Sequence, residues 1–305
     1  MKLLVTGASG MVGRNVLENP AAKEYEIVAP SHGELDLLDT LLTQRYVEQE
    51  KPDAVLHCAG RVGGIQANMN APATFMTENL LMGTNLVLAA RRMRVPRFLN
   101  LGSSCMYPKD SPEHLTEDML LGGPLEETNE GYALAKIAVS RLCDYVSAEE
   151  SELSYKTIVP CNLYGRFDSF DPKNSHMLPA AIRKVHEASL SGAVVEIWGN
   201  GEARREFMYA GDLADFLFFA LDNFDSIPAL LNVGLGEDLS INEYYHTIAK
   251  SLGVSVEYCH NLDKPTGMRR KVLDVSRVHA LGWRAKTSTV DGICSTFEYY
   301  RGLAQ

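Results

Sequence analysis

The sequence lacks the features that mark several large classes of protein. Lysine and arginine number 29 against 39 aspartates and glutamates, the formal net charge is −10, and no basic stripe dominates any segment. This balance argues against nucleic acid as a partner, although a local group of arginines could still bind a small anion. The most apolar interior stretch, Phe216–Leu221, is too short to span a bilayer, and the apolar run before Gly7 is too short for a signal peptide. We therefore expect a soluble, cytoplasmic protein with no membrane partner.

Cysteine is sparse and irregularly placed. The six cysteines form no Cys-x-x-Cys pair, so free thiols in a reducing compartment fit better than a disulfide framework, and we expect no metal site. The 305 residues are 46% apolar and 22% charged, which is the composition of an ordinary globular protein. The length predicts about two domains.

The stretch that organises the chain is its first fifteen residues. Leu3–Val5 is an apolar run without alternation, as expected of a strand buried on both faces of a parallel sheet. A Gly7-x-x-Gly10-x-x-Gly13 turn follows at once, and apolar residues then recur at helical spacing. Glycines let the backbone approach a pyrophosphate, and a helix N-terminus supplies unpaired N–H groups. This order indicates a dinucleotide-binding unit, although the commoner spacing is Gly-x-Gly-x-x-Gly.

Strands alternate with helices through the first half of the sequence. Further strand patterns lie at 25–29, 54–58, 96–101 and 155–159, with helix patterns between them that include 74–92 and 132–147. The alternation predicts an α/β fold with a Rossmann-type, doubly wound parallel sheet whose ligand lies beyond the carboxyl ends of the strands.

The pattern loosens after residue 160. Helix patterns recur at 178–188, 241–252 and 289–300, and strand patterns at 194–198 and 231–233. We expect a dinucleotide-binding domain of residues 1–160 plus about 206–235. A smaller, discontinuous C-terminal lobe of about 161–205 and 236–305 would then bind the substrate.

The most informative pair in the middle third is Tyr132 and Lys136. Four residues apart, they share one face of a predicted helix, and a lysine ammonium near a phenol would lower the pKa of the tyrosine. Such a tyrosine can protonate the oxygen of a ketone while hydride arrives at the carbon. Ser103 follows a predicted strand end, where its hydroxyl could hydrogen-bond the same oxygen. Together with the N-terminal glycine turn, these residues indicate a reductase.

In combination these residues resemble the extended short-chain dehydrogenases/reductases that act on nucleotide sugars. Finer matches resemble the members that epimerise and reduce GDP-4-keto-6-deoxy sugars, and they cover essentially the whole chain. The matching segments are Val62-Gly63-Gly64-Ile65-x-Ala67-Asn68, Gly102-Ser103-Ser104-Cys105-Met106-Tyr107-Pro108-Lys109, Thr128-Asn129-Glu130-x-Tyr132-Ala133, Asn162-Leu163-Tyr164-Gly165, Asn174-Ser175-His176, Trp198-Gly199-x-Gly201, Arg205-Glu206-Phe207, Lys264-Pro265-x-Gly267 and Leu273-Asp274-Val275. The resemblance implies NADP(H) as cofactor, a GDP-sugar as substrate, and a homodimer built from the helices at 74–92 and 132–147.

The resemblance also implies a proton-transferring pair. In that family a cysteine and a histidine move protons at C3 and C5 of the sugar before reduction, and the matching residues are Cys105 and His176. A thiol and an imidazole both titrate within reach of neutral pH, and a plain reductase would need neither. Taken singly, each could be a packing residue. We assign Cys105 as the base and His176 as the acid.

Two sets of binding residues follow from the same resemblance. For the cofactor they are Gly7, Ser9, Gly10, Met11, Val12, Gly13, His32, Asp36, Leu37, Ala59, Leu101, Gly102, Lys136, Pro160, Asn162, Leu163 and His176. For the GDP-sugar they are Lys184, Trp198, Arg205 and Asp274. Physically, cations suit a diphosphate, and an indole can pack on the face of a base or sugar.

The clearest departure from the family concerns the 2′-phosphate of the cofactor. Relatives that use NADPH carry arginines in the glycine turn and after the second strand, where this chain has Ser9 and His32. No carboxylate ends the second strand to bond a 2′-hydroxyl, so NADP(H) remains favoured over NAD(H). The candidate donors to the phosphate are Ser31, His32 and Arg14.

Three alternatives remain open. The same machinery could act on another GDP-keto sugar, such as a deoxyheptose or a colitose precursor. Epimerisation could be lost with reduction retained. The chain could also be a non-catalytic, nucleotide-binding regulatory protein, but a binding module has no need of Ser103, Tyr132 and Lys136 together.

Overall fold

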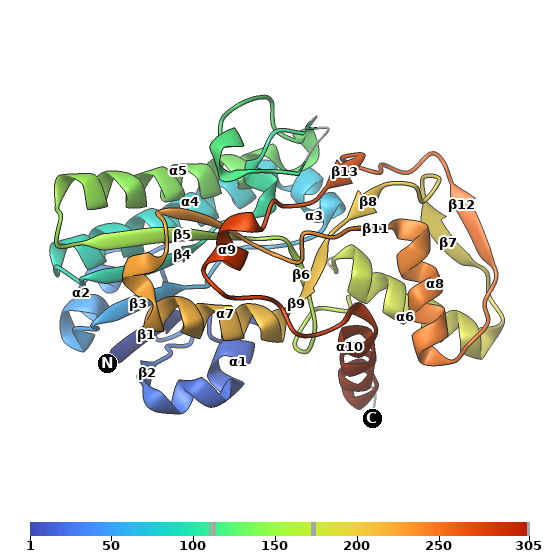
Figure 1. Ribbon diagram of the computed structural model, residues 1–305, viewed down its shortest axis with the longest axis horizontal. Helices are drawn as coiled ribbons and strands as arrows, with labels where there is room; N and C mark the ends of the chain where they lie inside the picture. Colours follow the sequence, from blue (N-terminus) through green and yellow to red (C-terminus); the bar gives the residue numbers. More distant parts are fainter. Residues whose placement is uncertain (110, 112–113, 172–174, 304–305) are drawn as a thin grey trace.

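A six-stranded parallel sheet forms the centre of the larger part of the molecule. The structure, a computed structural model, describes residues 1–109, 111, 114–171 and 175–303. The strand order is β10-β5-β4-β3-β1-β2, and every neighbouring pair is parallel (Figure 1). The strands are β1 (Lys2–Thr6), β2 (Glu26–Val28), β3 (Ala54–His57), β4 (Arg97–Leu101), β5 (Ser154–Pro160) and β10 (Leu230–Val233). The order reverses beside β1, which places the switch point next to the glycine turn.

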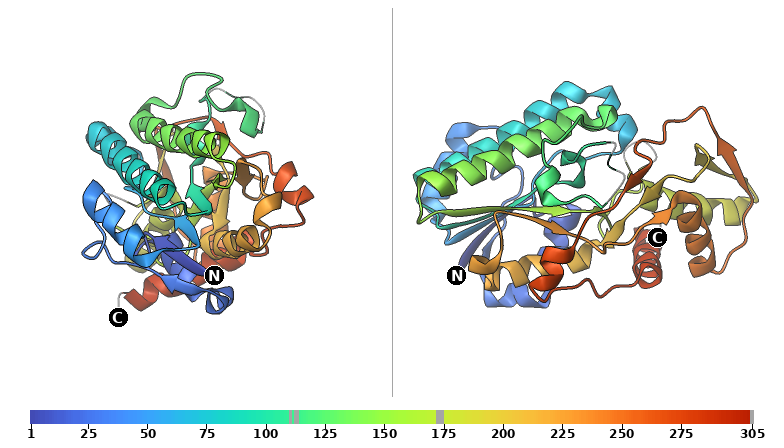
Figure 2. Two further views of the ribbon diagram at one scale, coloured as in Figure 1. Left: turned by 90° about the vertical axis from the view of Figure 1, so that its left-hand side faces the viewer. Right: turned by 45° about the horizontal axis from the view of Figure 1, so that its top comes forward.

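Helices cover both faces of this sheet (Figure 2). One face carries α1 (Met11–Glu18) and α7 (Ala210–Asp222), and the other carries α2 (Thr40–Glu50), α4 (Pro72–Arg92) and α5 (Glu130–Glu149). Leu3 and Val5 pack into the core cluster on the first side, whereas Leu4 packs into the cluster on the second. This two-sided burial explains the unalternating apolar run, and the predicted Rossmann-type, doubly wound fold is confirmed.

The glycine turn between β1 and α1 requires glycine at two positions. Gly7 has φ +72°, and a Cβ there would lie 2.6 Å from the backbone N of Ala59. A Cβ on Gly13 would lie 2.2 Å from the carbonyl oxygen of Gly7. The helix therefore packs directly against the turn, with its first N–H groups facing outward at the strand end.

The smaller lobe has its own core. Its helices are α6 (Met177–Ser191), α8 (Ile241–Leu252) and α10 (Thr289–Leu303), which pack around residues such as Ile182 and Ile248. Its strands are β7 (Val195–Trp198) paired with β12 (Tyr258–Asn261), and β8 (Arg204–Arg205) lying between β11 (Leu239–Ser240) and β13 (Arg270–Lys271).

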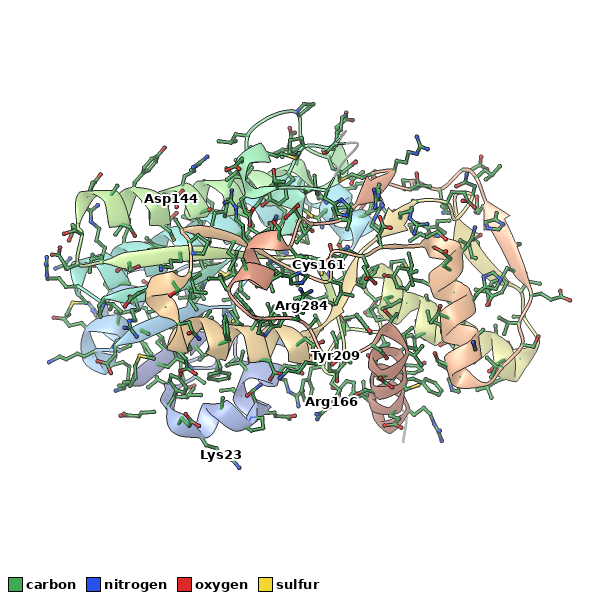
Figure 3. The ribbon with its side chains drawn as sticks, in the orientation of Figure 1. Lys23, Asp144, Cys161, Arg166, Tyr209 and Arg284 are labelled. Carbon is green, nitrogen blue, oxygen red and sulfur yellow. The ribbon has the colours of Figure 1, made fainter. Side chains whose placement is uncertain are left out.

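A short parallel pair connects the two parts. It consists of β6 (Asn162–Tyr164) and β9 (Phe207–Tyr209), and the Tyr209 hydroxyl lies 2.9 Å from the Ser295 hydroxyl on α10 (Figure 3). Because α7 and β10 return to the large sheet, we propose the domain division expected above, with crossings near residues 160, 206 and 235. Within the described ranges, no helix is long and apolar enough to cross a membrane.

The sequence patterns missed several short elements. These are α3 (Ile65–Asn70), α9 (Ser276–Ala280), the two-residue strands, and 3-10 turns that include Ser104–Met106 and Glu127–Asn129. Most of them border the cavity described next. There the segments are too short and irregular to show the hydrophobic periodicity of a helix or a strand.

Candidate active site

One large cavity lies between the carboxyl ends of the strands and the smaller lobe. Its volume is about 700 Å³, and its walls come from β1, β4, β5, α3, α5, α6, β7, β8 and β13 together with the intervening loops. Of the site residues predicted from the sequence, all line this cavity except Gly13, Asp36 and Asp274. The site residues predicted from separate sequence motifs therefore line one continuous cavity.

The glycine turn forms one end of the cavity. Residues 6–12 line it, and the Gly10 N–H donates to the Gly7 carbonyl at 3.0 Å, which closes the turn. Gly10 caps α1 without any side chain, so the first turn of the helix presents N–H groups to the cavity. This cradle fits the pyrophosphate of a dinucleotide.

The adenosine end of the cavity has few cationic groups. His32 lines it, but Arg14 does not, because the Arg14 guanidinium stacks over the Phe167 ring at 3.8 Å. The Ser31 N–H and hydroxyl donate to the Glu34 carboxylate at 2.8 and 2.7 Å, and these two bonds lower the pKa of Glu34. Of the three donors expected for a 2′-phosphate, only His32 both lines the cavity and makes no side-chain hydrogen bond among the described residues.

Ser103, Tyr132 and Lys136 converge where β4 ends. The Ser103 hydroxyl accepts the Cys105 N–H at 3.3 Å, and it lies close enough to the Tyr132 phenol to lower the pKa of that phenol. The Lys136 ammonium donates to the Leu101 carbonyl at 2.8 Å, and its pKa is lowered to about 8 by burial. Its Nζ lies 5.9 Å from the centre of the Tyr132 ring.

The expected lowering of the Tyr132 pKa by Lys136 is not found. Burial raises the pKa of Tyr132, a negative charge on Cys105 would raise it further, and the Ser103 hydrogen bond opposes this shift. The phenol is consequently held in its protonated form, which is the form a proton donor requires.

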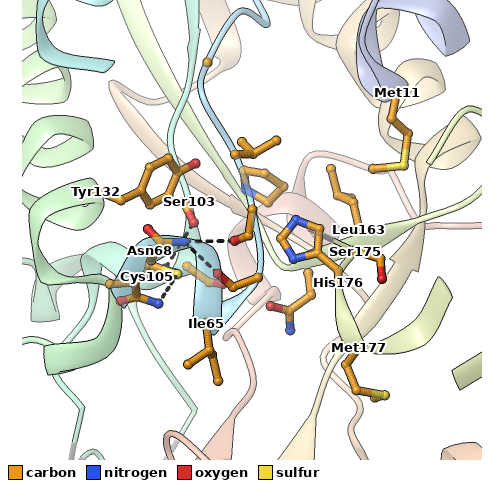
Figure 4. A pocket seen from close by; sticks show the side chains of 18 of the residues that line it. Met11, Ile65, Asn68, Ser103, Cys105, Tyr132, Leu163, Ser175, His176 and Met177 are labelled. Carbon is orange, nitrogen blue, oxygen red and sulfur yellow. Dashed lines mark hydrogen bonds between the residues drawn. The ribbon is translucent and has the colours of Figure 1, made fainter. Parts of the chain in front are cut away.

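Cys105 and His176 face the same cavity from different elements. Figure 4 shows Ser103, Cys105 and Tyr132 grouped together, with His176 entering from the segment that precedes α6. The Asn129 amide donates to the Cys105 Sγ at 3.3 Å, and the Lys271 ammonium donates to it at 3.6 Å. Burial lowers the pKa of His176, and the positive charge of Lys271 lowers it further.

Cations and one indole line the far end of the cavity. The Lys184 Nζ donates to the Glu196 carbonyl at 3.1 Å and lies 5.8 Å from the centre of a Trp198 ring. Arg205 is held by the carbonyls of Arg204 and Thr266 at 2.8 and 2.9 Å. Burial lowers the pKa of both Lys184 and Arg205. A bound anion such as a diphosphate would oppose this shift by stabilising the charged forms.

Three predicted ligand residues lie outside the cavity walls. Gly13 acts by allowing close packing of α1 on the turn. The Asp36 carboxylate accepts the Leu38 N–H at 2.9 Å, and the Asp274 carboxylate accepts the Ser276 N–H at 2.9 Å. Their contacts with a ligand remain predictions. Asn174, in one of the matched segments, lies outside the described residues.

Several polar residues of the cavity were not predicted as site residues, and four of them matter for the argument below. They are Asn68, Glu126, Asn129 and Lys271. The Asn68 amide holds the loop before α3 by donating to the carbonyls of Gly63 and Gly64 at 2.9 and 3.1 Å (Figure 4). Asn68 and Asn129 stand in the matched segments, and Lys271 lies two residues before Leu273-Asp274-Val275, so the motifs carried a usable signal.

A doubly wound sheet with a phosphate turn and a Ser/Tyr/Lys group at its carboxyl edge defines a nicotinamide-dependent oxidoreductase. The chain belongs to the NAD dependent epimerase/dehydratase family, whose defining pattern matches residues 3–234. The expected family and enzyme class are thereby confirmed.

Individual relatives narrow the comparison. The chain is 52% identical to the GDP-L-colitose synthase of Yersinia pseudotuberculosis, with 98% of each chain covered. It is 46% identical to the GDP-L-fucose synthase of Azorhizobium caulinodans, covering 98% of this chain and 96% of the relative. A Campylobacter jejuni GDP-D-glycero-L-gluco-heptose synthase, solved in the presence of NADPH, superposes with a TM-score of 0.91 at 30% identity and covers 98% of each chain.

Proposed function

We propose that the chain is an NADPH-dependent epimerase-reductase that converts GDP-4-keto-6-deoxy-mannose to GDP-L-fucose. The observation that carries this proposal is the convergence of Ser103, Tyr132, Cys105 and His176 on one cavity. A reductase needs the first two, and only an epimerase has use for the others. The names of several relatives at 37 to 46% identity support the same activity.

The residues divide the chemistry between them. Cys105 removes a proton beside the C4 ketone, the electron pair of that C–H bond moves into an enolate, and His176 returns a proton to the other face of the carbon. The Tyr132 and Ser103 hydroxyls stabilise the oxygen charge of the enolate. In the reduction, NADPH supplies the hydride to C4, and Tyr132 gives its proton to the oxygen. Lys136 would hold the nicotinamide ribose.

The remaining cavity residues would bind the substrate. Arg205 and Lys184, with Arg183 beside it, suit the diphosphate, and Trp198 offers a face for the base or sugar. We also propose that the protein is cytoplasmic and that it forms a homodimer through α4 and α5. The dimer is proposed because α4 exposes Leu81 and Leu88, which lie seven residues apart and so on one face of the helix. Light scattering of a Leu81→Glu, Leu88→Glu variant tests this, since retention of a dimer would contradict the proposed interface.

A second candidate substrate is a GDP-colitose precursor. The observation that favours it is the 52% identity to a GDP-L-colitose synthase. The catalytic residues would keep the same roles, so the cavity chemistry does not distinguish the two sugars.

The decisive experiment offers the enzyme each keto sugar with NADPH in D₂O. NADPH consumption is followed by absorbance, and NMR identifies the product and the carbons that carry deuterium. We expect deuterium at C3 and C5 of the product, and we expect Cys105→Ser and His176→Gln to abolish it while sparing hydride transfer to an already epimerised sugar. If the wild-type enzyme reduces its substrate without incorporating deuterium, it is a reductase only.

A further inference from the structure

Lys271 is a buried cation on the cavity wall. Its side chain comes from the two-residue strand β13, and the residue is only 9% exposed. Glu206, a buried carboxylate next to this sheet, is committed elsewhere, because its oxygens accept the N–H groups of Leu235, Gly236 and Leu273. Among the ion pairs of the described residues, none includes Lys271.

The one side-chain acceptor described for the Lys271 ammonium is the sulfur of Cys105, at 3.6 Å. Asn129 donates its amide to the same sulfur at 3.3 Å. An ordinary buried cysteine behaves as a small apolar residue and needs no such donors. Two donors from distant segments on one sulfur instead match the needs of a sulfur that carries negative charge.

Burial of an ammonium is costly unless an opposite charge lies beside it. Arg205 and Tyr132 also interact electrostatically with Cys105, and neither supplies a negative charge at neutral pH. Glu126, a carboxylate of the same cavity, interacts with Arg205. A thiolate at Cys105 would supply that charge within the cavity wall itself.

We propose that Lys271, assisted by Asn129, holds Cys105 as the thiolate that takes the proton from the sugar carbon. This inference rests on the proposed role of Cys105 as the base. In the step, the carbon-bound proton forms an S–H bond, the C–H electron pair becomes the enolate, and the negative charge passes from sulfur to the ketone oxygen. The Lys271 ammonium thus contacts a reacting atom, the Cys105 sulfur.

The same positive charge has a matching effect on the acid. Lys271 adds to burial in lowering the pKa of His176, so a protonated imidazole there gives up its proton more readily. The same lowering reduces the protonated fraction of His176 at neutral pH, so the proton that His176 gives up must reach it during the reaction.

The test measures the sulfur without any sugar present. Iodoacetamide is applied at pH 7, and the alkylation of the peptide that contains Cys105 is followed by mass spectrometry. Because the thiolate is the nucleophile, we expect Lys271→Met to slow this alkylation about tenfold, and Lys271→Arg to stay near the wild-type rate. Lys250→Met, an exposed lysine on α8, is the matched control.

A second readout separates this role from substrate binding. Lys271→Met should lose solvent deuterium incorporation about tenfold, yet transfer hydride to an already epimerised sugar with little change in KM. An unchanged alkylation rate with a raised KM for every sugar would show that Lys271 binds the diphosphate, and would overturn the proposal. If Lys271→Met fails to fold, Asn129→Ala serves instead, with slower alkylation expected and an unchanged rate again contradicting the inference. Absence of deuterium in the wild type would refute epimerisation alone, because alkylation still reports the thiolate.

Discussion

Tyr132→Phe tests the reductive half of the mechanism with the smallest structural change. The substitution removes one hydroxyl and keeps a ring whose centre lies 5.9 Å from the Lys136 Nζ. The phenol loses its polar contact with Ser103, and the Ser103 hydroxyl keeps its bond from the Cys105 N–H. The protein should therefore fold normally. Loss of the proton donor should lower kcat by about 10²–10⁴-fold, equivalent to about 3–5 kcal/mol of transition-state stabilisation.

Single-turnover kinetics show whether this loss lies in the chemical step. NADPH absorbance is followed after mixing with an already epimerised keto sugar, so that proton exchange at carbon does not contribute. Tyr145→Phe is the control, because Tyr145 lies on the same helix with 62% of its surface exposed. Hydride transfer by Tyr132→Phe at near the wild-type rate would refute the assignment of Tyr132 as the acid.

Three further predictions follow from the same geometry. His32→Arg should raise the ratio of kcat/KM for NADPH over NADH about tenfold, because none of the described residues at the adenosine end offers an arginine to the 2′-phosphate. An unchanged ratio would place the phosphate elsewhere. The rate of hydride transfer should fall above about pH 8 as Lys136 loses its proton. Burial of this lysine should also make the free energy of unfolding rise with pH between about 8 and 10.5, since the unfolded chain binds more protons than the folded chain in that range. Burial raises the pKa of Asp168 to about 7, so its ionisation costs stability as the pH rises from about 4 through 7; urea unfolding of Asp168→Asn should show a gain of roughly 1–3 kcal/mol at pH 8 and no gain at pH 4.

The large sheet could be predicted because its signals are local. Leu3–Val5 has an apolar side chain on each face of β1, and the spacing of the three glycines follows from backbone contacts inside one turn. The helix at Tyr132 likewise brings Lys136 to the same face by its period alone. Each of these features is decided within about ten residues, so the sequence pattern was sufficient.

The pKa of Tyr132 shows where local reasoning stops. Helical spacing correctly places Lys136 near the phenol, but the ammonium points to the Leu101 carbonyl. Desolvation is the largest influence on the Tyr132 phenol and raises its pKa. How deeply a side chain is buried depends on which loops cover it, and spacing along a helix carries no information about that.

Lys271 is the strongest case of a residue fixed by the fold rather than by its neighbours in sequence. It stands 166 residues from Cys105, and in a charged segment such a lysine resembles a solvated surface group. Two contacts of Glu206 anchor its strand: the Glu206 N–H donates to the Lys271 carbonyl at 3.3 Å, and the Glu206 carboxylate accepts the Leu273 N–H at 2.8 Å. Because Glu206 holds the chain at both Lys271 and Leu273, β13 has a single register. The pleat of the strand then directs the Lys271 side chain into the cavity. The buried Glu206 carboxylate thus determines where the Lys271 ammonium meets the Cys105 thiol.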